Sequence, residues 1–101
     1  MRLLADISQL FVDEVPRHLA QIRSALDAHD ACALRRAAHG LKGAAANFDA
    51  AAVVDAARTL EERGRSGDFI NEENVWIRLT TETSLLVSTL QAYAFPQSAA
   101  S

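Results

Sequence analysis

His39 stands among residues that are suited to handling an anionic group. Arg35, Arg36, Lys42 and Gly43 lie three and four positions away from it, and residues with this spacing are surface neighbours on a helix. A neutral imidazole nitrogen is a nucleophile, while ammonium and guanidinium groups bind phosphoryl oxygens. We therefore predict an exposed His39 surrounded by positive charge, suited to accepting a phosphoryl group.

Two glycines beside this histidine indicate that its surroundings are kept open. Gly40 and Gly43 each cost up to about 1 kcal/mol relative to alanine inside a helix, although alanine is used freely around them. We expect the missing side chains to clear space for another molecule near the ring. Lys42 is the only lysine of the chain, beside nine arginines, and its compact ammonium is expected one helical turn from the imidazole.

The other histidines and the single cysteine do not suggest a second site. We expect His18 on a helix surface and His29 in a turn, and Cys32 has no partner for an internal disulfide. No two histidines are four positions apart, so no metal site is predicted. The motif around His39 has no nucleophilic serine or cysteine and no carboxylate, which argues against a hydrolase. Without a glycine-rich phosphate loop, the chain should not bind ATP or phosphorylate itself.

Length and composition indicate one helical domain that folds in water. The 101 residues are 50% hydrophobic and 23% charged, with a net charge of −3, which argues against disorder and against a nucleic-acid binder. No apolar run approaches the roughly 20 residues of a membrane span, and the charge of Asp6 comes too early for a secretory signal. The single cysteine fits a reducing, cytoplasmic setting.

Four helical stretches are predicted, over residues 3–28, 31–46, 50–63 and 72–93. Twenty alanines and twelve leucines, against six valines and four isoleucines, favour helices over strands. Pro16 interrupts the first stretch, which is therefore either a kinked helix or a short helix followed by a longer one.

Residues suited to helix ends lie between these stretches. Asp30, Asp49 and Asn71 are placed to cap the second, third and fourth helices. Gly64 fits the left-handed residue that ends many helices. Because the connections are short, successive helices should be antiparallel neighbours.

Apolar residues recur at spacings of three and four in every stretch, so each helix has one face for the core. These residues are Leu3, Ile7, Leu10, Phe11, Val15, Leu19, Ile22 and Leu26, then Leu34, Ala38, Leu41, Ala45 and Phe48, then Val53, Ala56, Ala57 and Leu60, and finally Trp76, Leu79, Thr83, Leu86, Leu90 and Tyr93. The predicted fold is all-α: an antiparallel up-down four-helix bundle over residues 1–95, with a flexible tail over residues 96–101.

The run His39-x-Leu41-Lys42-Gly43, followed by small residues, resembles the signature of histidine-containing phosphotransfer (HPt) domains. These are four-helix bundles of this length that relay phosphoryl groups in two-component phosphorelays, and the resemblance covers nearly the whole chain. Residues similar to those of the family also stand at Phe11, Pro16, Asp30, Leu60 and Glu61. The chain departs from the family at Gly40, where many members have serine or threonine, and at Asp49, where a glycine is common.

The resemblance implies a role for each residue of the motif. His39 would be the phosphoacceptor, with Lys42 and Gly43 completing the reactive site and Glu61 as the candidate that orients the imidazole. The residues implied to face the partner are Arg35, Arg36, Gly40 and Ala46. That partner would be the receiver domain of a response regulator or of a hybrid sensor kinase, and it would bring the Mg²⁺ ion, with no cofactor and no metal site in this chain.

Two readings of the function stay open at this point. The chain is either a phosphotransfer intermediate or a non-catalytic module that docks a receiver or another regulatory protein through the face of the second helix. We expect a cytoplasmic monomer without direct membrane contact. It is either freestanding or the soluble end of a hybrid sensor kinase that is itself membrane-anchored.

Overall fold

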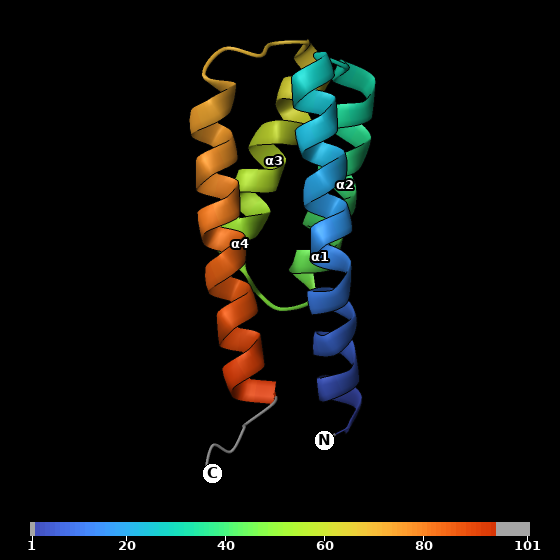
Figure 1. Cartoon of the computed structure of the whole chain (residues 1–101), viewed down its shortest axis with the longest axis vertical. Coiled ribbons are helices and arrows are strands. Elements are labelled where there is room, and N and C mark those ends of the chain that lie inside the picture. The colour runs from blue at the N-terminus through green and yellow to red at the C-terminus, as the bar shows by residue number, and fades with distance from the viewer. Residues whose placement is uncertain (1, 95–101) are drawn as a thin grey trace.

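The computed structural model describes residues 2–94, which form four antiparallel α-helices (Figure 1). Their bounds are α1, Arg2–Ala28; α2, Ala31–Ala46; α3, Ala51–Ser66; and α4, Glu72–Ala94. The start of α1 and the end of α4 lie at the same end of the bundle. The all-α, four-helix fold predicted from the sequence is confirmed, while the predicted tail over residues 96–101 lies outside the described residues.

Helix α1 runs without interruption through Pro16. The alternative of a short helix followed by a longer one is therefore wrong. A proline inside a helix removes one backbone hydrogen bond. Pro16 lies on the exposed side of α1, where water can bond to the carbonyl group that loses its amide partner.

Of the four predicted helix-end residues, Asp30 is correct, Asp49 and Gly64 are wrong, and Asn71 directly precedes α4 but adopts a left-handed φ of 59°. The Asp30 side chain caps α2 by accepting a hydrogen bond from the Ala33 amide at 3.1 Å. Asp49 does not cap α3, because it adopts a left-handed φ of 54° and Ala50 occupies the cap position without a side-chain hydrogen bond. The left-handed residue that ends α3 is Gly67, with φ of 76°, and Gly64 lies inside the helix.

Gly64 instead sets the distance between α2 and α3. A Cβ atom at this position would lie 2.6 Å from the amide nitrogen of Arg35 and 2.7 Å from the carbonyl oxygen of Ala31. Any side chain here would collide with the backbone of α2, so only glycine allows this approach. The contact fixes α3 against the helix that contains His39.

The core lies between the four helices and contains most of the predicted apolar stripes. Its largest fully buried side chains are Ile22, Leu26, Leu34, Leu41, Leu60 and Leu79. Ile7 and Leu10, predicted in the stripe of α1, are exposed. Figure 1 shows that α1 begins beyond the turn between α2 and α3. Ser8, which lies between these two residues in the sequence, is fully buried, so the buried face of α1 at this end differs from the apolar stripe. Leu3 and Tyr93 lie outside the residues whose side chains are described.

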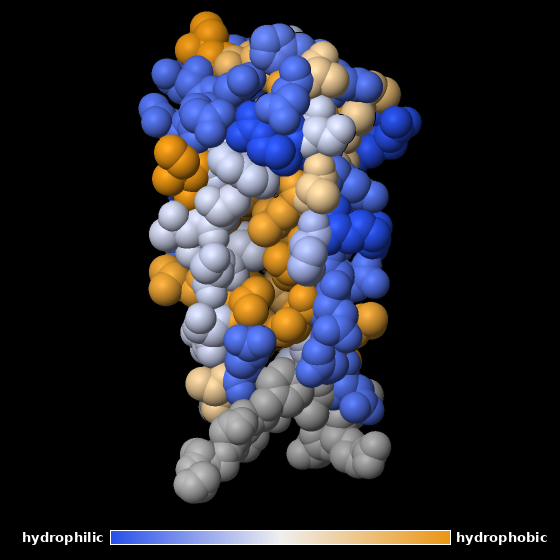
Figure 2. All heavy atoms as spheres, in the orientation of Figure 1, coloured by the Kyte–Doolittle hydropathy of each residue, from blue (hydrophilic) through white to orange (hydrophobic). Residues whose placement is uncertain are grey.

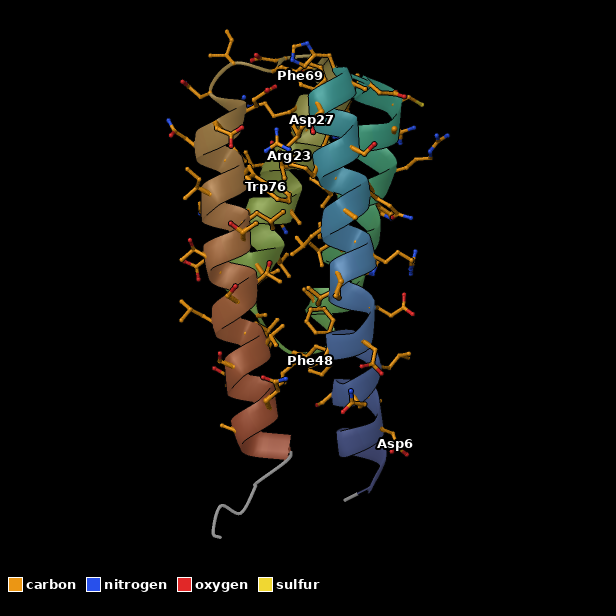
Figure 3. All side chains as sticks on the ribbon, in the orientation of Figure 1. Asp6, Arg23, Asp27, Phe48, Phe69 and Trp76 are labelled. Atoms are coloured by element: carbon orange, nitrogen blue, oxygen red, sulfur yellow. The ribbon has the colours of Figure 1, made fainter. Side chains whose placement is uncertain are left out.

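Helices α1 and α4 meet along a partly open seam. Figure 2 shows apolar side chains between the polar surfaces of these two helices. Near the other end, Arg23 extends from α1 over the Trp76 ring, 5.1 Å from its centroid (Figure 3), and pairs with Glu73 at 3.2 Å. None of the described helices combines the length and the hydropathy needed to cross a membrane.

Candidate functional site

His39 lies on the exposed face of α2. Its side chain keeps 68% of its surface accessible, while Leu34, Ala38 and Leu41 of the same helix are fully buried. This arrangement follows from the helical period, because the apolar stripe and the histidine fall on opposite sides. The prediction that His39 points to solvent is confirmed.

Glu61 of α3 contacts one nitrogen of this ring. Its Oε2 atom lies 2.8 Å from Nδ1 of His39, and its side chain is only 8% exposed. In the tautomer that carries its proton on Nδ1, the Nδ1–H group donates a hydrogen bond to the carboxylate, and the lone pair of Nε2 is available for attack. Glu61, which the resemblance implies as the residue that orients the imidazole, thus contacts Nδ1 of His39.

Glu61 also binds the lysine of the motif. Nζ of Lys42 lies 2.5 Å from Oε1, and the lysine side chain is 26% exposed. The hydrogen bond from Lys42 is the main cause that holds the pKa of Glu61 below its usual value; burial opposes it and the hydrogen bond with His39 adds to it. The carboxylate is therefore charged at neutral pH, and its two oxygens have different partners on α2.

Arg65 is a further cation at this site, and it was not predicted from the sequence. Its Nη2 atom lies 3.9 Å from Oε2 of Glu61, one turn along α3, and its side chain is 63% exposed. The spacing of four residues from Glu61 is visible in the sequence. It became informative only once Glu61 was known to contact His39.

The two glycines of the motif have different surroundings. A Cβ atom at Gly43 would meet nothing within 4 Å, so the space there is open. At Gly40 it would lie 3.6 Å from Cε1 of His18, so the imidazole of α1 occupies part of that space. His18 is accordingly half-buried rather than a plain surface residue. Burial, followed by the charge of Arg17, lowers its pKa.

The remaining predicted partner-facing residues lie on the surface of α2. Arg35, Arg36 and Ala46 are all exposed. Arg36 also contributes to an open groove of about 570 Å³ between α1 and α2, together with Arg17 and several small residues. The surface of α2 near His39 thus carries positive charge, and the groove beside Arg36 is lined mainly by small residues.

Histidine, cysteine and carboxylate side chains are otherwise dispersed. Across residues 2–94, no three of them come together in a way that could hold a metal ion. His29 lies in the turn after α1, as expected, where its ring stacks on Phe69 with the centroids 4.7 Å apart. Cys32 is exposed and free.

Comparisons with known proteins agree with this geometry at the level of the family. A search of curated proteins and a search of solved structures each found no match. The family model of the Hpt domain matches residues 6–92, which include α2 and α3, most of α1 and α4, and the complete site. This chain therefore belongs to the Hpt domain family, whose members act in phosphotransfer in two-component phosphorelays.

Proposed function

We propose that this chain relays a phosphoryl group between aspartates of receiver domains, with Nε2 of His39 as the acceptor atom. The observation that carries the proposal is the 2.8 Å contact between Nδ1 and Glu61 on an imidazole that is otherwise exposed. An acceptor histidine needs one nitrogen held as a donor and the other free for attack. His39 meets both requirements.

The reaction requires no covalent chemistry beyond the exchange of one bond. Nε2 attacks the phosphorus of an aspartyl phosphate on the receiver, the N–P bond forms, and the O–P bond breaks with its electron pair returning to the aspartate. Positive charge develops on the imidazole during the attack. The Glu61 carboxylate at Nδ1 stabilises that charge, and Lys42 keeps the carboxylate in place. Transfer to a second receiver is the reverse sequence.

The receiver is proposed to dock over the exposed face of α2. Its phosphorylation site is acidic and would contain the Mg²⁺ ion that assists phosphoryl transfer. Arg35 and Arg36 provide the complementary charge, and the open space at Gly43 allows the aspartyl phosphate to approach the ring. The groove between α1 and α2 extends this surface beside Arg36.

Transfer of label tests the proposal directly. The protein is incubated with a phosphorylated receiver domain, and we expect a label on the chain that survives base and is lost in acid. His39→Gln should abolish the label, whereas His29→Gln, at a histidine in the turn after α1, should retain it. If neither the wild-type chain nor His39→Gln takes up label while both bind the receiver, the chain is an interaction module and not a relay.

A further inference from the structure

Three side chains, Lys42, His39 and Arg65, approach the carboxylate of Glu61, and their distances to its oxygens differ. Lys42 and His39 are within hydrogen-bond distance of its oxygens, at 2.5 and 2.8 Å. Arg65 is at 3.9 Å from Oε2, which is an ion-pair distance but too long for a hydrogen bond. The carboxylate is therefore already satisfied by α2, and the guanidinium of Arg65 is the least constrained member of the group.

Arg65 approaches the same oxygen of Glu61 as the acceptor ring does. Its Nη2 atom and Nδ1 of His39 both lie within 3.9 Å of the same Glu61 oxygen, although they come from different helices. The arginine side chain is largely exposed, so it can change rotamer without disturbing the core. An exposed ion pair at this distance contributes little to stability, so leaving it costs little.

Lys42, in contrast to Arg65, is tightly held. Its ammonium lies on the most buried carboxylate of the described chain, and three quarters of its side-chain surface is covered. Moving it to a phosphoryl group would leave Glu61 without its main partner, and an uncompensated buried charge is costly. The geometry thus leaves Lys42 to hold Glu61 in place, while Arg65 is able to bind another anionic group.

We propose that Arg65 is a catalytic residue of the phosphotransfer: its guanidinium binds the phosphoryl oxygens on His39 during and after transfer, while Lys42 stays on Glu61 and holds it in place. This inference rests on the proposed function and assigns the phosphoryl contact within it. The step itself is unchanged, with the Nε2–P bond forming and the O–P bond to the receiver aspartate breaking. Arg65 neutralises the equatorial oxygens of the phosphoryl group during the transfer. The planar guanidinium suits this role, because its N–H groups can bind two phosphoryl oxygens at once.

A small phosphodonor separates this role from receiver docking. Phosphoramidate is used to phosphorylate the purified chain, and the rate of label uptake is compared for wild type, Arg65→Gln, Arg65→Lys and Arg58→Gln. Arg58 is the matched control, because it is exposed on the same helix and pairs with Asp55 instead. We expect Arg65→Gln to be slower by about tenfold, the factor that corresponds to about 1.4 kcal/mol of lost transition-state binding. Arg65→Lys should be intermediate and Arg58→Gln unchanged.

Magnetic resonance measures the contact itself. The ³¹P resonance of the phosphohistidine should shift in Arg65→Gln and stay in place in Arg58→Gln. The ring ¹⁵N shifts of unphosphorylated His39 should change in Lys42→Gln, because Glu61 loses its anchor, but not in Arg65→Gln. Circular dichroism establishes that each variant is folded.

The outcomes are distinct. Wild-type uptake rate and ³¹P shift in Arg65→Gln overturn the role of Arg65 while the proposed function stands. A defect that appears only with the receiver as donor, and not with phosphoramidate, makes Arg65 a docking residue and equally overturns the proposal. If wild-type protein is labelled by neither donor, the proposed function itself fails and the role of Arg65 falls with it.

Discussion

At the scale of single residues, the site depends on one buried carboxylate. Glu61 gives one oxygen to His39 and the other to Lys42. The exposure of His39 was predicted from its neighbours on the helix, and the role of Glu61 beside it was implied by the resemblance to HPt domains. Arg65 was not predicted, because sequence spacing alone does not tell which of the two glutamates of α3 turns toward α2.

Replacing this carboxylate by its neutral amide tests its electrostatic role. Glu61→Gln retains an acceptor for Nδ1 but removes the negative charge that stabilises the imidazolium formed during attack. We expect uptake of phosphoryl from phosphoramidate to fall by about tenfold, equivalent to about 1.4 kcal/mol, with the fold retained. Glu62→Gln, at the exposed neighbouring position, is the control. Equal uptake rates in Glu61→Gln and Glu62→Gln would show that the charge of Glu61 does not contribute to the transfer.

His18 predicts a pH dependence of stability above the range in which carboxylates titrate. Burial and Arg17 lower its pKa from 6.5, so above pH 6.5 the imidazole is neutral in both states and contributes nothing. Below pH 6.5 the unfolded chain binds the proton first, and the free energy of unfolding falls until the lower folded-state pKa is reached. Urea denaturation of wild type and His18→Gln at pH 7.5 and 5.5 measures this effect. The difference in stability between the two pH values should be smaller in the variant.

At the scale of helices, the distance between α2 and α3 decides whether the site exists. Gly64 provides it, with its Cβ position 2.6 Å from the backbone of Arg35. The sequence contains glycines at 64 and 67, and either can end a helix by the same rule. Choosing between them requires knowing that α2 crosses at Gly64, which is tertiary information. The cap at Asp30 was predictable because it depends only on local geometry.

Two alanine substitutions with opposite effects test this close approach. Gly64→Ala must push the helices apart, and overpacking of this kind costs about 1–3 kcal/mol. It should also weaken the contact between Glu61 and His39, visible in the ring ¹⁵N shifts of His39. Gly43→Ala meets nothing within 4 Å and should raise stability by up to about 1 kcal/mol. Thermal and urea denaturation measure both; a Gly64→Ala variant as stable as wild type would contradict the packing argument.

At the scale of the whole molecule, α1 and α4 are longer than the helices that contain the site. The number of helices was predicted from the apolar periodicity, and their antiparallel arrangement was predicted from the short connections. The exposure of Ile7 and Leu10 was not predicted, because the face of α1 that is covered near its start contains the polar Ser8, which is fully buried, and not the apolar stripe. The continuous course of α1 through Pro16 was likewise not predictable from local signals. Phe11 and Val15 before the proline and Ile22 after it are all buried in the core, and this packing offsets the local cost of proline.

The contact between Arg23 and Trp76 offers a test of stability that is separate from the reaction. Arg23→Gln removes a cation–π contact and its exposed ion pairs, for a loss of about 0.5–1 kcal/mol. Label uptake at His39 should be unaffected, because neither residue contacts the site. Urea denaturation and the phosphoramidate assay measure the two quantities. A slowed uptake in a fully folded Arg23→Gln variant would indicate that the α1–α4 seam influences α2.

The glycine contact between α2 and α3 makes chemical competence a property of native packing. The proposed nucleophile His39 and the carboxylate of Glu61 belong to separate helices. An excised peptide corresponding to α2 would therefore retain His39 and Lys42 but lack the carboxylate that is proposed to fix the tautomer. During a thermal melt, phosphoryl acceptance should therefore disappear in step with the cooperative loss of tertiary structure. The proposed phosphotransfer would therefore stop as soon as α2 and α3 separate.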